Sequence, residues 1–343
     1  MKKVIIIVVL VLVAAGATLG AFGYFKLLKK SPSKGQDIYV ATGSDYESLK
    51  KQLLKEGIID DEIAFDFTAQ ALRYGESVKP GKYEIKKGIS MLNLVRKLRA
   101  GDVGTVNVTF HNVRTLEAVA GRVATYIEAD SVELLNAFND STLWLGSAVG
   151  ETEFCNLIPN TYDFFWNTSG EEFVLRMKQE AEKFWNDDRL AKAAEMDMSP
   201  CEIVNLAAIV QEEQSGILSE QPTIAGLYYN RLRRNMLLQA DPTLKYVAGD
   251  FSIKRLLNYH KELESPYNTY KYAGLPPSPI VIPEPGAIDA VLDHEEHSYL
   301  YMCAKEDFSG EHNFAKTLRQ HNINARRYQR ALSAEMRRAR NNN

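Results

Sequence analysis

Two adjacent glutamates stand at the end of an apolar run in the segment IVQEEQSG, residues 209–216. A carboxyl group that is removed from water is harder to ionise, so its pKa rises and it can hold a proton near neutral pH. A protonated carboxyl can act as the general acid that protonates a leaving oxygen. The alternative is an ordinary charged helix end. The chemistry of the segment therefore depends on which glutamate faces the protein interior.

The helix expected to carry this pair has a clear start. Ser199 is followed by Pro200 and then by Glu202, which is the pattern of a capping box with proline in the first turn. The next apolar residues have the spacing of one helix face: Ile203, Leu206, Ala207 and Val210. Continuing that face reaches Glu213, whereas Glu212 lies about 100° around the helix. We therefore expect Glu213 to be directed toward the interior and Glu212 toward water, unless Glu213 bends out from the last turn.

Stretches further along the chain are rich in groups that bind sugars. They are YNRLRRNMLLQADPT, SPYNTY, GLPPSPI and HNFAKTLRQHN, at residues 229–243, 265–270, 274–280 and 312–322. Their amides, hydroxyls and carboxyls are poor material for a core, and proline restricts the backbone in several of them. Because loops held by a rigid fold often carry function, we expect these stretches to bind a glycan.

Together with AAIVQEEQ (207–214), these motifs closely resemble, in the same order, the membrane-anchored endolytic murein transglycosylases, the MltG or YceG-like family. The resemblance runs from the N-terminal apolar segment to about Leu332 and is strongest from Leu206 to Pro277. It implies cleavage of the β-1,4 bond between N-acetylmuramic acid and N-acetylglucosamine to leave 1,6-anhydro ends. It also implies a single catalytic glutamate that acts first as acid and then as base, and Glu213 is its counterpart here.

This sequence departs from the family pattern at three positions. Gln211 stands where a first glutamate is common, and Gln214 stands where threonine is common. Asn160 lies in PNTY (159–162), where the family tends to have aspartate. If the protein works with Gln211, an acid at that position is dispensable, and Glu213 is left as the acid on the apolar face.

Seven polar residues in these motifs are candidates for glycan positioning and for support of Glu213: Asn230, Gln239, Asp241, Thr243, Tyr267, Asn268 and Tyr270. Asp241 precedes a proline, so capping a turn is an equal alternative for it. His312 and His321 either contact the ligand or form hydrogen bonds within the core, and the second interpretation is favoured. No cofactor or metal is expected, because His294-Glu-Glu-His297 lacks the spacing of the zinc-protease motif.

Two alternatives to a lytic transglycosylase remain open. One is a peptidoglycan hydrolase (muramidase), and the other is a non-enzymatic wall-binding scaffold of the elongation or division machinery. The expected partners are peptidoglycan glycan strands, the membrane and peptidoglycan synthases of that machinery. The net charge of -3 carries no signature of nucleic-acid binding, and no nucleic-acid partner is expected.

The N-terminal segment is long and apolar enough to cross a membrane. Residues 4–25 carry no charge, and a helix of that length spans a hydrocarbon core of roughly 30 Å. A cleaved signal peptide would have a shorter apolar region and a small-x-small site, which Gly20 and Ala21 fit poorly. Lysines flank both ends, so positive charge does not set the orientation. Because a large C-terminal domain can be translocated regardless of charge, we predict a single-pass anchor with the catalytic domain on the extracytoplasmic (periplasmic) side of the cell membrane.

The rest of the chain predicts an α+β protein in which a small LysM-like α/β domain precedes a larger, helix-rich mixed catalytic domain. The smaller domain is expected to contain strands at 37–43 and 82–86 and helices at 46–55, 63–74 and 91–98. A LysM-like domain implies glycan binding, and a plain spacer is the alternative. The predicted divisions are a cytoplasmic tail (1–3), a transmembrane helix (4–25), a short solvated linker (26–36), the LysM-like domain (37–104), the transglycosylase domain (105–338) and a tail (339–343).

Three further segments carry predictions of their own. The aromatic stretch CNLIPNTYDFFWNTSG (155–170) is expected to be a loop, either lining a sugar groove or forming a corner of the core. Cys155, Cys201 and Cys303 are expected to be buried thiols, because an odd number at wide spacing shows no disulfide framework. The basic run 325–340 is expected to be a solvated terminal helix, with contact to an anionic surface as the alternative.

Overall fold

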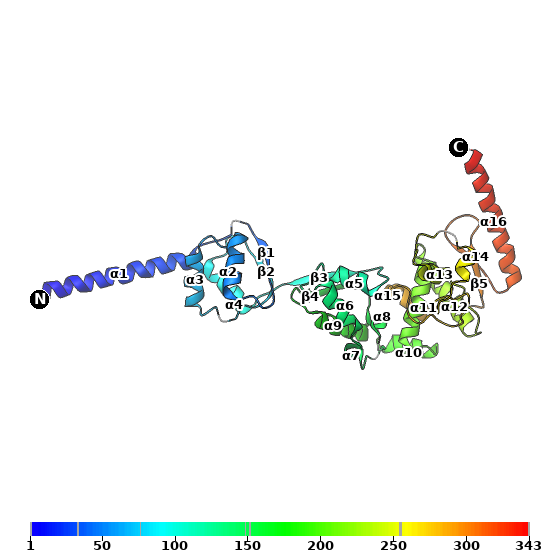
Figure 1. The fold of residues 1–343 in the computed structure, drawn as a ribbon, viewed down its shortest axis with the longest axis horizontal. Helices are drawn as coiled ribbons and strands as arrows, with labels where there is room; N and C mark the ends of the chain where they lie inside the picture. The colour runs from blue at the N-terminus through cyan, green and yellow to red at the C-terminus, as the bar shows by residue number, and fades with distance from the viewer. Residues whose placement is uncertain are drawn as a thin grey trace. The chain divides into compact units, whose positions relative to one another are not determined.

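The computed structural model describes residues 2–32, 34–75, 77–147, 149–150, 152–253 and 256–341. It is a helix-rich α+β structure, as the sequence predicts (Figure 1). The chain forms two compact units. The N-terminal unit comprises residues 1–108, 123–130 and 161–169, and the C-terminal unit comprises residues 109–122, 131–160 and 170–343.

The N-terminal unit is built on one antiparallel pair of strands with helices packed against it. Its elements after the first helix are β1 (Gln36–Val40), α2 (Tyr46–Lys55), α3 (Glu62–Ala71), β2 (Gly81–Ile85) and α4 (Met91–Ala100). The side chains of Asp45, Asp61 and Ser90 accept hydrogen bonds from backbone N–H groups at the starts of the three helices. These caps satisfy donors that the first helical turn leaves free, and apolar side chains from strands and helices fill one buried core.

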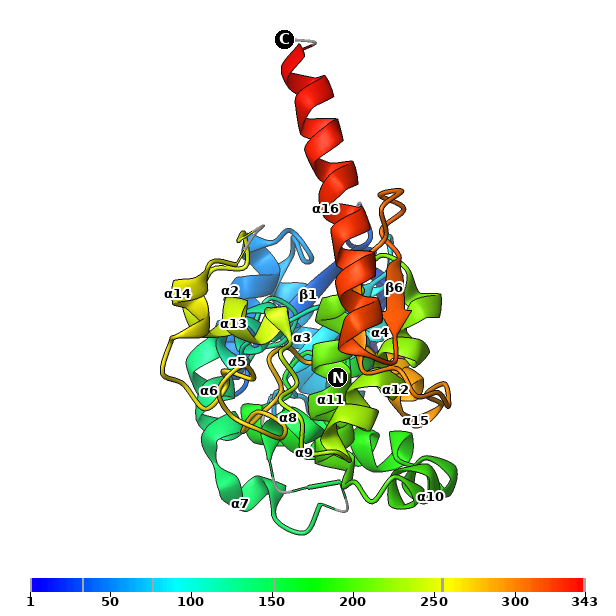
Figure 2. The same ribbon diagram turned by 90° about the vertical axis from the view of Figure 1, so that its right-hand side faces the viewer.

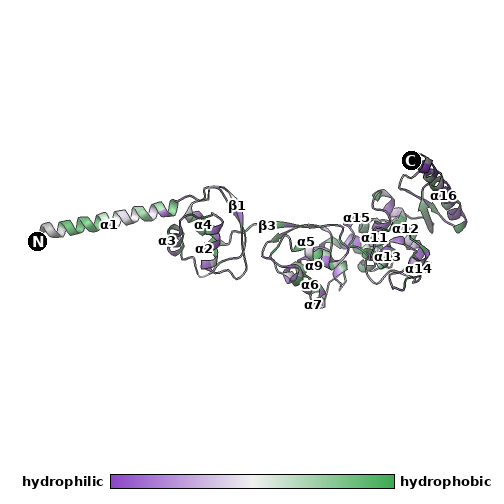
Figure 3. Cartoon of the chain, turned by 45° about the horizontal axis from the view of Figure 1, so that its top comes forward, coloured by the Kyte–Doolittle hydropathy of each residue, from purple (hydrophilic) through white to green (hydrophobic). Residues whose placement is uncertain are grey.

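Helix α1 (Lys2–Leu28) precedes this core. Within the described part of the chain, its residues 6–28 form the one helix that is long and apolar enough to cross a membrane. Figure 3 shows most of its length as hydrophobic. The helix is therefore compatible with a membrane anchor. A signal sequence meets the same criterion of length and composition.

Part of the segment predicted as a solvated linker packs on the N-terminal unit, whereas Leu28, Lys30 and residues 34–36 are exposed. Lys26 Nζ lies 2.5 Å and Lys29 Nζ lies 3.2 Å from Asp61 Oδ2. These lysines, together with the N–H of Ala64, hold the pKa of Asp61 at about 2. The buried Ser31 also donates its N–H to the backbone of Ile89. The segment differs from a free linker because its charges and backbone groups find partners on α3 and before α4.

Strand β3 (Thr105–Phe110) pairs with β4 (Asn160–Phe165). The aromatic stretch predicted as a loop is therefore a strand over part of its length. Tyr162 and Phe164 are buried, and Trp166 contacts the ring of Tyr39 within the N-terminal unit. The loop prediction was wrong because alternate aromatic residues face a core, which matches the two-residue period of a strand. This packing favours the core alternative over a sugar-lining loop.

The C-terminal unit is helical apart from a hairpin near its end. Its elements are α5 (Leu116–Val123), α6 (Ser131–Asn139), α7 (Ser141–Trp144), α8 (Glu153–Asn156), α9 (Gly170–Phe184), α10 (Asp187–Glu195), α11 (Pro200–Glu213), the 3-10 helix η1 (Leu218–Glu220), α12 (Gln221–Leu232), α13 (Asp241–Ala248), α14 (Asn258–Lys261), α15 (Pro285–Leu292), β5 (Tyr301–Ala304), β6 (His312–Ala315) and α16 (Leu318–Asn341). Figure 1 shows α11 among α10, α12, α13 and α15.

Helix α11 forms the centre of this unit. The predicted capping box of Ser199 and Glu202 is confirmed, and the helix ends at Glu213. The prediction of a single apolar face was incomplete, because every residue from 203 to 211 is buried. Helices α8, α10, α12, α13 and α15 all contact α11, so protein surrounds its residues 203–211. A helix of this kind can deliver a side chain at its end to a site with a rigid backbone behind it.

The hairpin β5–β6 and helix α16 end the chain. Cys303 on β5 lies opposite Asn313 on β6 in an antiparallel register. Figure 2 shows α16 beginning beside β6 and extending beyond the hairpin. Its last turns carry the exposed side chains of Arg337, Arg338 and Arg340. The prediction of a solvated basic helix is confirmed.

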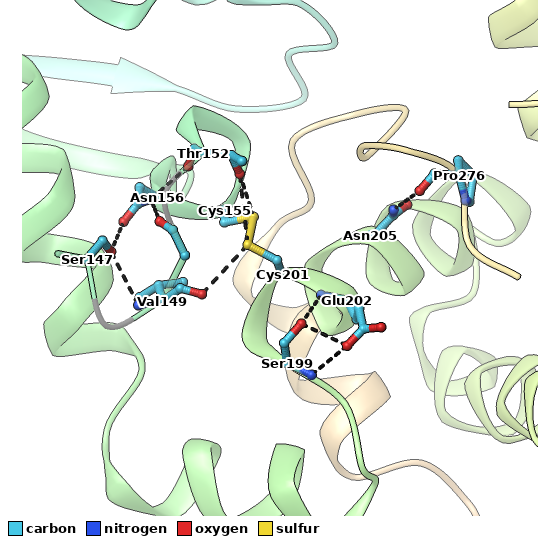
Figure 4. The surroundings of a disulfide bond; sticks show 11 residues. Ser147, Val149, Thr152, Cys155, Asn156, Ser199, Cys201, Glu202, Asn205 and Pro276 are labelled. Carbon is cyan, nitrogen blue, oxygen red and sulfur yellow. Dashed lines mark hydrogen bonds between the residues drawn. A yellow bond between two sulfur atoms is a disulfide. The ribbon is translucent and has the colours of Figure 1, made fainter. Parts of the chain in front are cut away.

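A disulfide joins Cys155 on α8 to Cys201 in the first turn of α11, with the two Cα atoms 5.2 Å apart (Figure 4). The prediction of three buried thiols was therefore wrong, and Cys303 alone is a free cysteine among the described residues. The 46-residue separation carries no sequence pattern, and the packing of α8 on α11 brings the sulfur atoms together. The cross-link and the capping box of Ser199 both act at the N-terminal end of α11.

We expect Cys201→Ser to destabilise the folded protein by about 2–4 kcal/mol, because the open chain gains conformational entropy when a loop of this length is released. The measurement is chemical denaturation of the full-length protein in detergent under oxidising conditions. Cys303→Ser is the matched control and should leave the denaturation midpoint nearly unchanged. Equal midpoints for the two variants would contradict the presence of the cross-link.

Candidate active site

The carboxyl group of Glu213 lies at the last residue of α11, where the buried helix meets a cavity. Helix α12 packs against α11, and its Tyr228 is only 2% exposed. The Tyr228 hydroxyl donates a hydrogen bond to Glu213 Oε1 at 2.6 Å. Glu213 itself is partly buried and lines the cavity. Protein therefore covers most of this carboxyl group and leaves part of the residue facing open space.

Burial raises the pKa of Glu213 to about 7. The negative charge of Asp241 adds to the rise, because two nearby carboxylates disfavour each other. Three interactions act in the opposite direction: the Tyr228 hydrogen bond, the positive charge of Lys245 and a hydrogen bond from the backbone N–H of Asp241. A substantial fraction of Glu213 is consequently protonated at neutral pH, which is the state that a general acid requires.

Asp241, at the first position of α13, is held by a second tyrosine. The Tyr270 hydroxyl donates to Asp241 Oδ1 at 2.5 Å. Burial raises the pKa of both Tyr270 and Tyr228 well above the usual range. Both phenols therefore keep their protons at neutral pH and act as donors, one to each carboxyl group.

Two cavities share Glu213, Asp241 and Tyr270 in their walls. The histidine-side cavity, of about 370 Å³, also contains Tyr228, Arg231, Gln239, Tyr301, His312 and His321. The lysine-side cavity, of about 380 Å³, also contains Glu212, Pro242, Lys245, Leu256 and Lys261. Glu213 thus faces open space in two directions. A larger cavity of about 1080 Å³ is lined by the first half of α11 and does not include Glu213.

The histidine-side cavity has a rigid wall. The buried Arg231 guanidinium donates to the carbonyls of Leu300 and Leu238 at 2.6 and 2.8 Å. His312 Nδ1 lies 2.8 Å from Glu220 Oε2. Burial lowers the pKa of His321, so this imidazole is neutral at pH 7. These contacts give His312 a structural partner, and they make Arg231 a support for the backbone that carries Gln239.

The structure brings three of the seven predicted binding residues to the walls of these cavities: Gln239, Asp241 and Tyr270. Thr243 and Asn268 are fully buried. The Thr243 hydroxyl bonds Ala240 and Thr269, and the Asn268 amide bonds the carbonyls of Lys261 and Leu263. Both side chains therefore support the loops behind the cavities.

The two remaining predicted residues lie away from Glu213. The Asn230 amide donates to the carbonyl of His297 at 2.8 Å and so ties α12 to the segment before β5. Tyr267 lines the cavity of about 1080 Å³, where its hydroxyl is 2.7 Å from Ser278 Oγ. Neither side chain lines the cavities that contain Glu213.

Glu212 is not directed freely to water. Arg114 Nη2 lies 2.7 Å from Glu212 Oε2, and the glutamate side chain is only 18% exposed. The expectation of a solvated residue was wrong, because α11 is covered on the side that the helical phase left to solvent. Glu212 instead forms an ion pair with Arg114, whereas Glu213 accepts a hydrogen bond from the uncharged phenol of Tyr228.

The two glutamines beside the pair have structural contacts. Gln211 is buried, and its Oε1 accepts a hydrogen bond from the N–H of Glu284 at 2.7 Å. Gln214 Nε2 donates to Gly310, and its Oε1 accepts from the N–H of Ile217. A neutral amide makes these bonds without burying a charge, which explains how glutamine is accommodated at both positions.

Sequence reasoning missed Tyr228, Lys245 and Lys261 as residues of the site. Tyr228 belongs to the apolar stripe of α12, which by itself indicates a core residue. Lys245 and Lys261 lie in separate helices, α13 and α14, with no motif to connect them. Among the described residues, no group of three or more His, Cys, Asp or Glu side chains is placed to hold a metal ion. The ring of His294 meets the ring of Tyr229 in an edge-to-face contact, and His297 Nε2 lies 2.8 Å from the Thr223 carbonyl.

Comparison with known proteins relates the chain to one family. The model of the YceG-like family matches residues 38–327. An endolytic murein transglycosylase of Bacillus subtilis (strain 168) is 27% identical over 330 residues, with 90% of each chain covered. One of Streptococcus pneumoniae serotype 2 (strain D39) is 25% identical over 337 residues, which cover 87% of this chain and 60% of that protein.

A crystal structure of a YceG-like protein from Listeria monocytogenes has the same fold. Its TM-score is 0.56 at 24% sequence identity, and the match covers 85% of this chain and 99% of that chain.

We expect substitutions of Tyr228 and Asp241 to move the pKa of Glu213 in opposite directions. Tyr228→Phe removes a hydrogen bond that favours the charged carboxylate, so the pKa should rise. Asp241→Asn removes a negative charge that disfavours the carboxylate, so the pKa should fall.

The measurement is a carbon-13 NMR titration of the full-length protein labelled at glutamate carboxyl groups. Glu213→Gln identifies the signal, and Tyr259→Phe, at an exposed tyrosine, is the control that should leave the titration in place. Movement of both pKa values in the same direction would contradict this account of the site.

Proposed function

Because this chain belongs to the YceG-like family, we propose that it is a lytic transglycosylase that cleaves the glycan strands of peptidoglycan. Its similarity to proteins named endolytic murein transglycosylase supports the reaction class. The observation that carries the proposal is the setting of Glu213. A carboxyl group with a pKa of about 7 faces two cavities with polar and aromatic walls.

In the proposed reaction, one carboxyl group acts twice. Protonated Glu213 gives its proton to the glycosidic oxygen as the bond from that oxygen to C1 of N-acetylmuramic acid breaks. The hydroxyl of N-acetylglucosamine leaves, and the muramic sugar acquires oxocarbenium character. The Glu213 carboxylate then takes the proton of the C6 hydroxyl while O6 bonds to C1. The product is a 1,6-anhydro ring, the carboxyl is protonated again, and no water is consumed.

Asp241 adds a second carboxylate to this scheme in a supporting role. A fixed negative charge beside the reacting carbon stabilises positive charge that develops in the transition state. Tyr270 holds one oxygen of Asp241, which limits the orientations of the carboxylate. The same charge keeps Glu213 protonated at higher pH. We therefore assign electrostatic support to Asp241 and the proton transfers to Glu213.

The two cavities fit cleavage within a strand. An enzyme that cuts inside a polymer has to hold sugars on both sides of the broken bond. Glu213 lies in the walls of both cavities, so a strand passing between them would place a glycosidic bond at this carboxyl. This arrangement supports the endolytic form of the reaction.

The proposed location is the outer face of the cell membrane, with α1 as a single-pass anchor. The disulfide supports an extracytoplasmic C-terminal unit, because such bonds persist in oxidising compartments.

We also propose the transglycosylase domain over residues 105–338, a glycan-binding LysM-like role for residues 37–104, and contact with peptidoglycan synthases of the elongation or division machinery.

Glu213→Gln should lower the rate of glycan cleavage by about 10²–10⁴-fold, because the amide cannot donate a proton. The measurement is release of soluble fragments from purified peptidoglycan by the full-length protein. Glu182→Gln, at an exposed position of α9, is the matched control and should cleave normally. Glu212→Gln should lose at most about tenfold, since it breaks an ion pair but leaves the acid in place. Undiminished cleavage by Glu213→Gln would remove this residue from the mechanism.

The ends of the products distinguish the proposed reaction from its alternatives. Mass spectrometry should find 1,6-anhydro-N-acetylmuramic acid at the new ends. Reducing ends would indicate a hydrolase instead, with Asp241 as an obvious second carboxyl group. A folded wild-type protein that binds peptidoglycan but releases no fragments would indicate a scaffold.

A further inference from the structure

Two lysines face the lysine-side cavity without an acidic partner. Lys245 lies on α13, and Lys261 ends α14, with its Nζ 4.9 Å from the centre of the Tyr270 ring. Both side chains are partly buried and line the cavity beside Glu213. Among the described residues, neither lysine forms an ion pair.

The carboxyl groups in the same walls are already engaged. Glu212 pairs with Arg114, and Asp241 accepts the Tyr270 hydroxyl. Asp241 and Lys245 are four residues apart on α13, a spacing that permits an ion pair, yet none forms. The pKa of Glu213 is raised to about 7, so a substantial fraction of this carboxyl group is uncharged at neutral pH. The cavity therefore presents two ammonium groups that form no ion pair, beside the carboxylate of Asp241, and ammonium groups left without a paired acid attract anions.

We propose that the lysine-side cavity binds a carboxylate of the stem peptide on the muramic sugar next to the cleaved bond. This inference rests on the proposed function and extends it to the substrate, which would be peptide-bearing glycan. The sugar backbone of the strand carries no charge, so it offers no anionic group to Lys245 and Lys261. The stem peptide hangs from the lactyl arm of N-acetylmuramic acid and carries free carboxylates. Ammonium groups bind carboxylates through charge-assisted hydrogen bonds, which are stronger than neutral ones.

Tyr270 connects Lys261 to the acidic residues of the site. Tyr270 lies under Lys261 and holds Asp241, and Asp241 acts on Glu213. A peptide carboxylate at the two ammonium groups would therefore fix the muramic sugar relative to the proton donor. Such positioning raises the rate of cleavage through the orientation of the bond.

The test compares kcat/KM of the full-length protein on three substrates: intact glycan strands, strands whose carboxyl groups have been converted to amides, and strands stripped of stem peptides by an amidase. The stripped strands keep a carboxylate on the lactyl arm itself, so they separate the two sources of this charge. For the wild type, intact strands should exceed amidated strands about tenfold, the scale of one charge-assisted hydrogen bond.

Lys245→Gln and Lys261→Gln should each reduce this ratio toward one, and Lys245→Arg should restore most of it. Lys183→Gln, an exposed lysine of α9, is the matched control. The inference is overturned if the ratio in the glutamine variants equals that of the wild type. It is also overturned if stripped strands are as sensitive to these substitutions as intact ones, because the lactyl carboxylate would then be the ligand. Failure of the proposed function is a different result, namely no anhydro products from any of the three substrates with the wild type.

Discussion

The loss of water around one carboxyl group governs the arrangement of this site. Glu213 is the last residue of a helix that is buried on every side, so the backbone that delivers it has little freedom to withdraw. Burial alone would make the charged form costly, and the neighbouring charge of Asp241 adds to that cost. Tyr228, Lys245 and the N–H of Asp241 oppose both effects and leave the pKa at about 7. A group poised there can give up a proton and take one back at neutral pH, which is what a single acid–base residue must do.

The surrounding fold fixes the positions of Glu213 and of the residues that act on its pKa. A capping box and a disulfide hold the first turn of α11, and five helices pack along its length. Tyr228 is nearly inaccessible on α12, and Arg231 on the same helix ties the loop before α13 to the segment before β5. Asp241 therefore reaches Glu213 from a separate helix without depending on a flexible loop. The open space beside the carboxyl lies in two cavities that share Glu213, Asp241 and Tyr270 in their walls.

Local signals in the sequence were sufficient for much of the fold. The capping box at Ser199, the end of α11 at Glu213 and helix α2 at residues 46–55 all follow from caps and apolar spacing, and the structure has them. Features that depend on contacts between distant segments could not be predicted. Nothing in the helical phase of α11 shows that Arg114 covers Glu212, and nothing in the spacing of cysteines 46 residues apart indicates a disulfide. The partners of Glu213 are of the same kind, because Tyr228, Asp241 and Lys245 meet it only after α12 and α13 have packed. The burial of Thr243 and Asn268 could not be predicted for the same reason, because the hydrogen-bond partners of these polar residues lie on other segments of the chain.

The pH dependence of cleavage tests the central claim most directly, because it measures the protonation state in which Glu213 works. If the protonated carboxyl starts the reaction, kcat/KM for intact strands falls as pH rises through about 7, and the midpoint coincides with the titration of Glu213 itself. The alkaline limb should then move to higher pH in Tyr228→Phe and to lower pH in Asp241→Asn, following the pKa of the acid. A rate that stays constant between about pH 6 and pH 9, or a limb that does not move with these substitutions, would contradict the account.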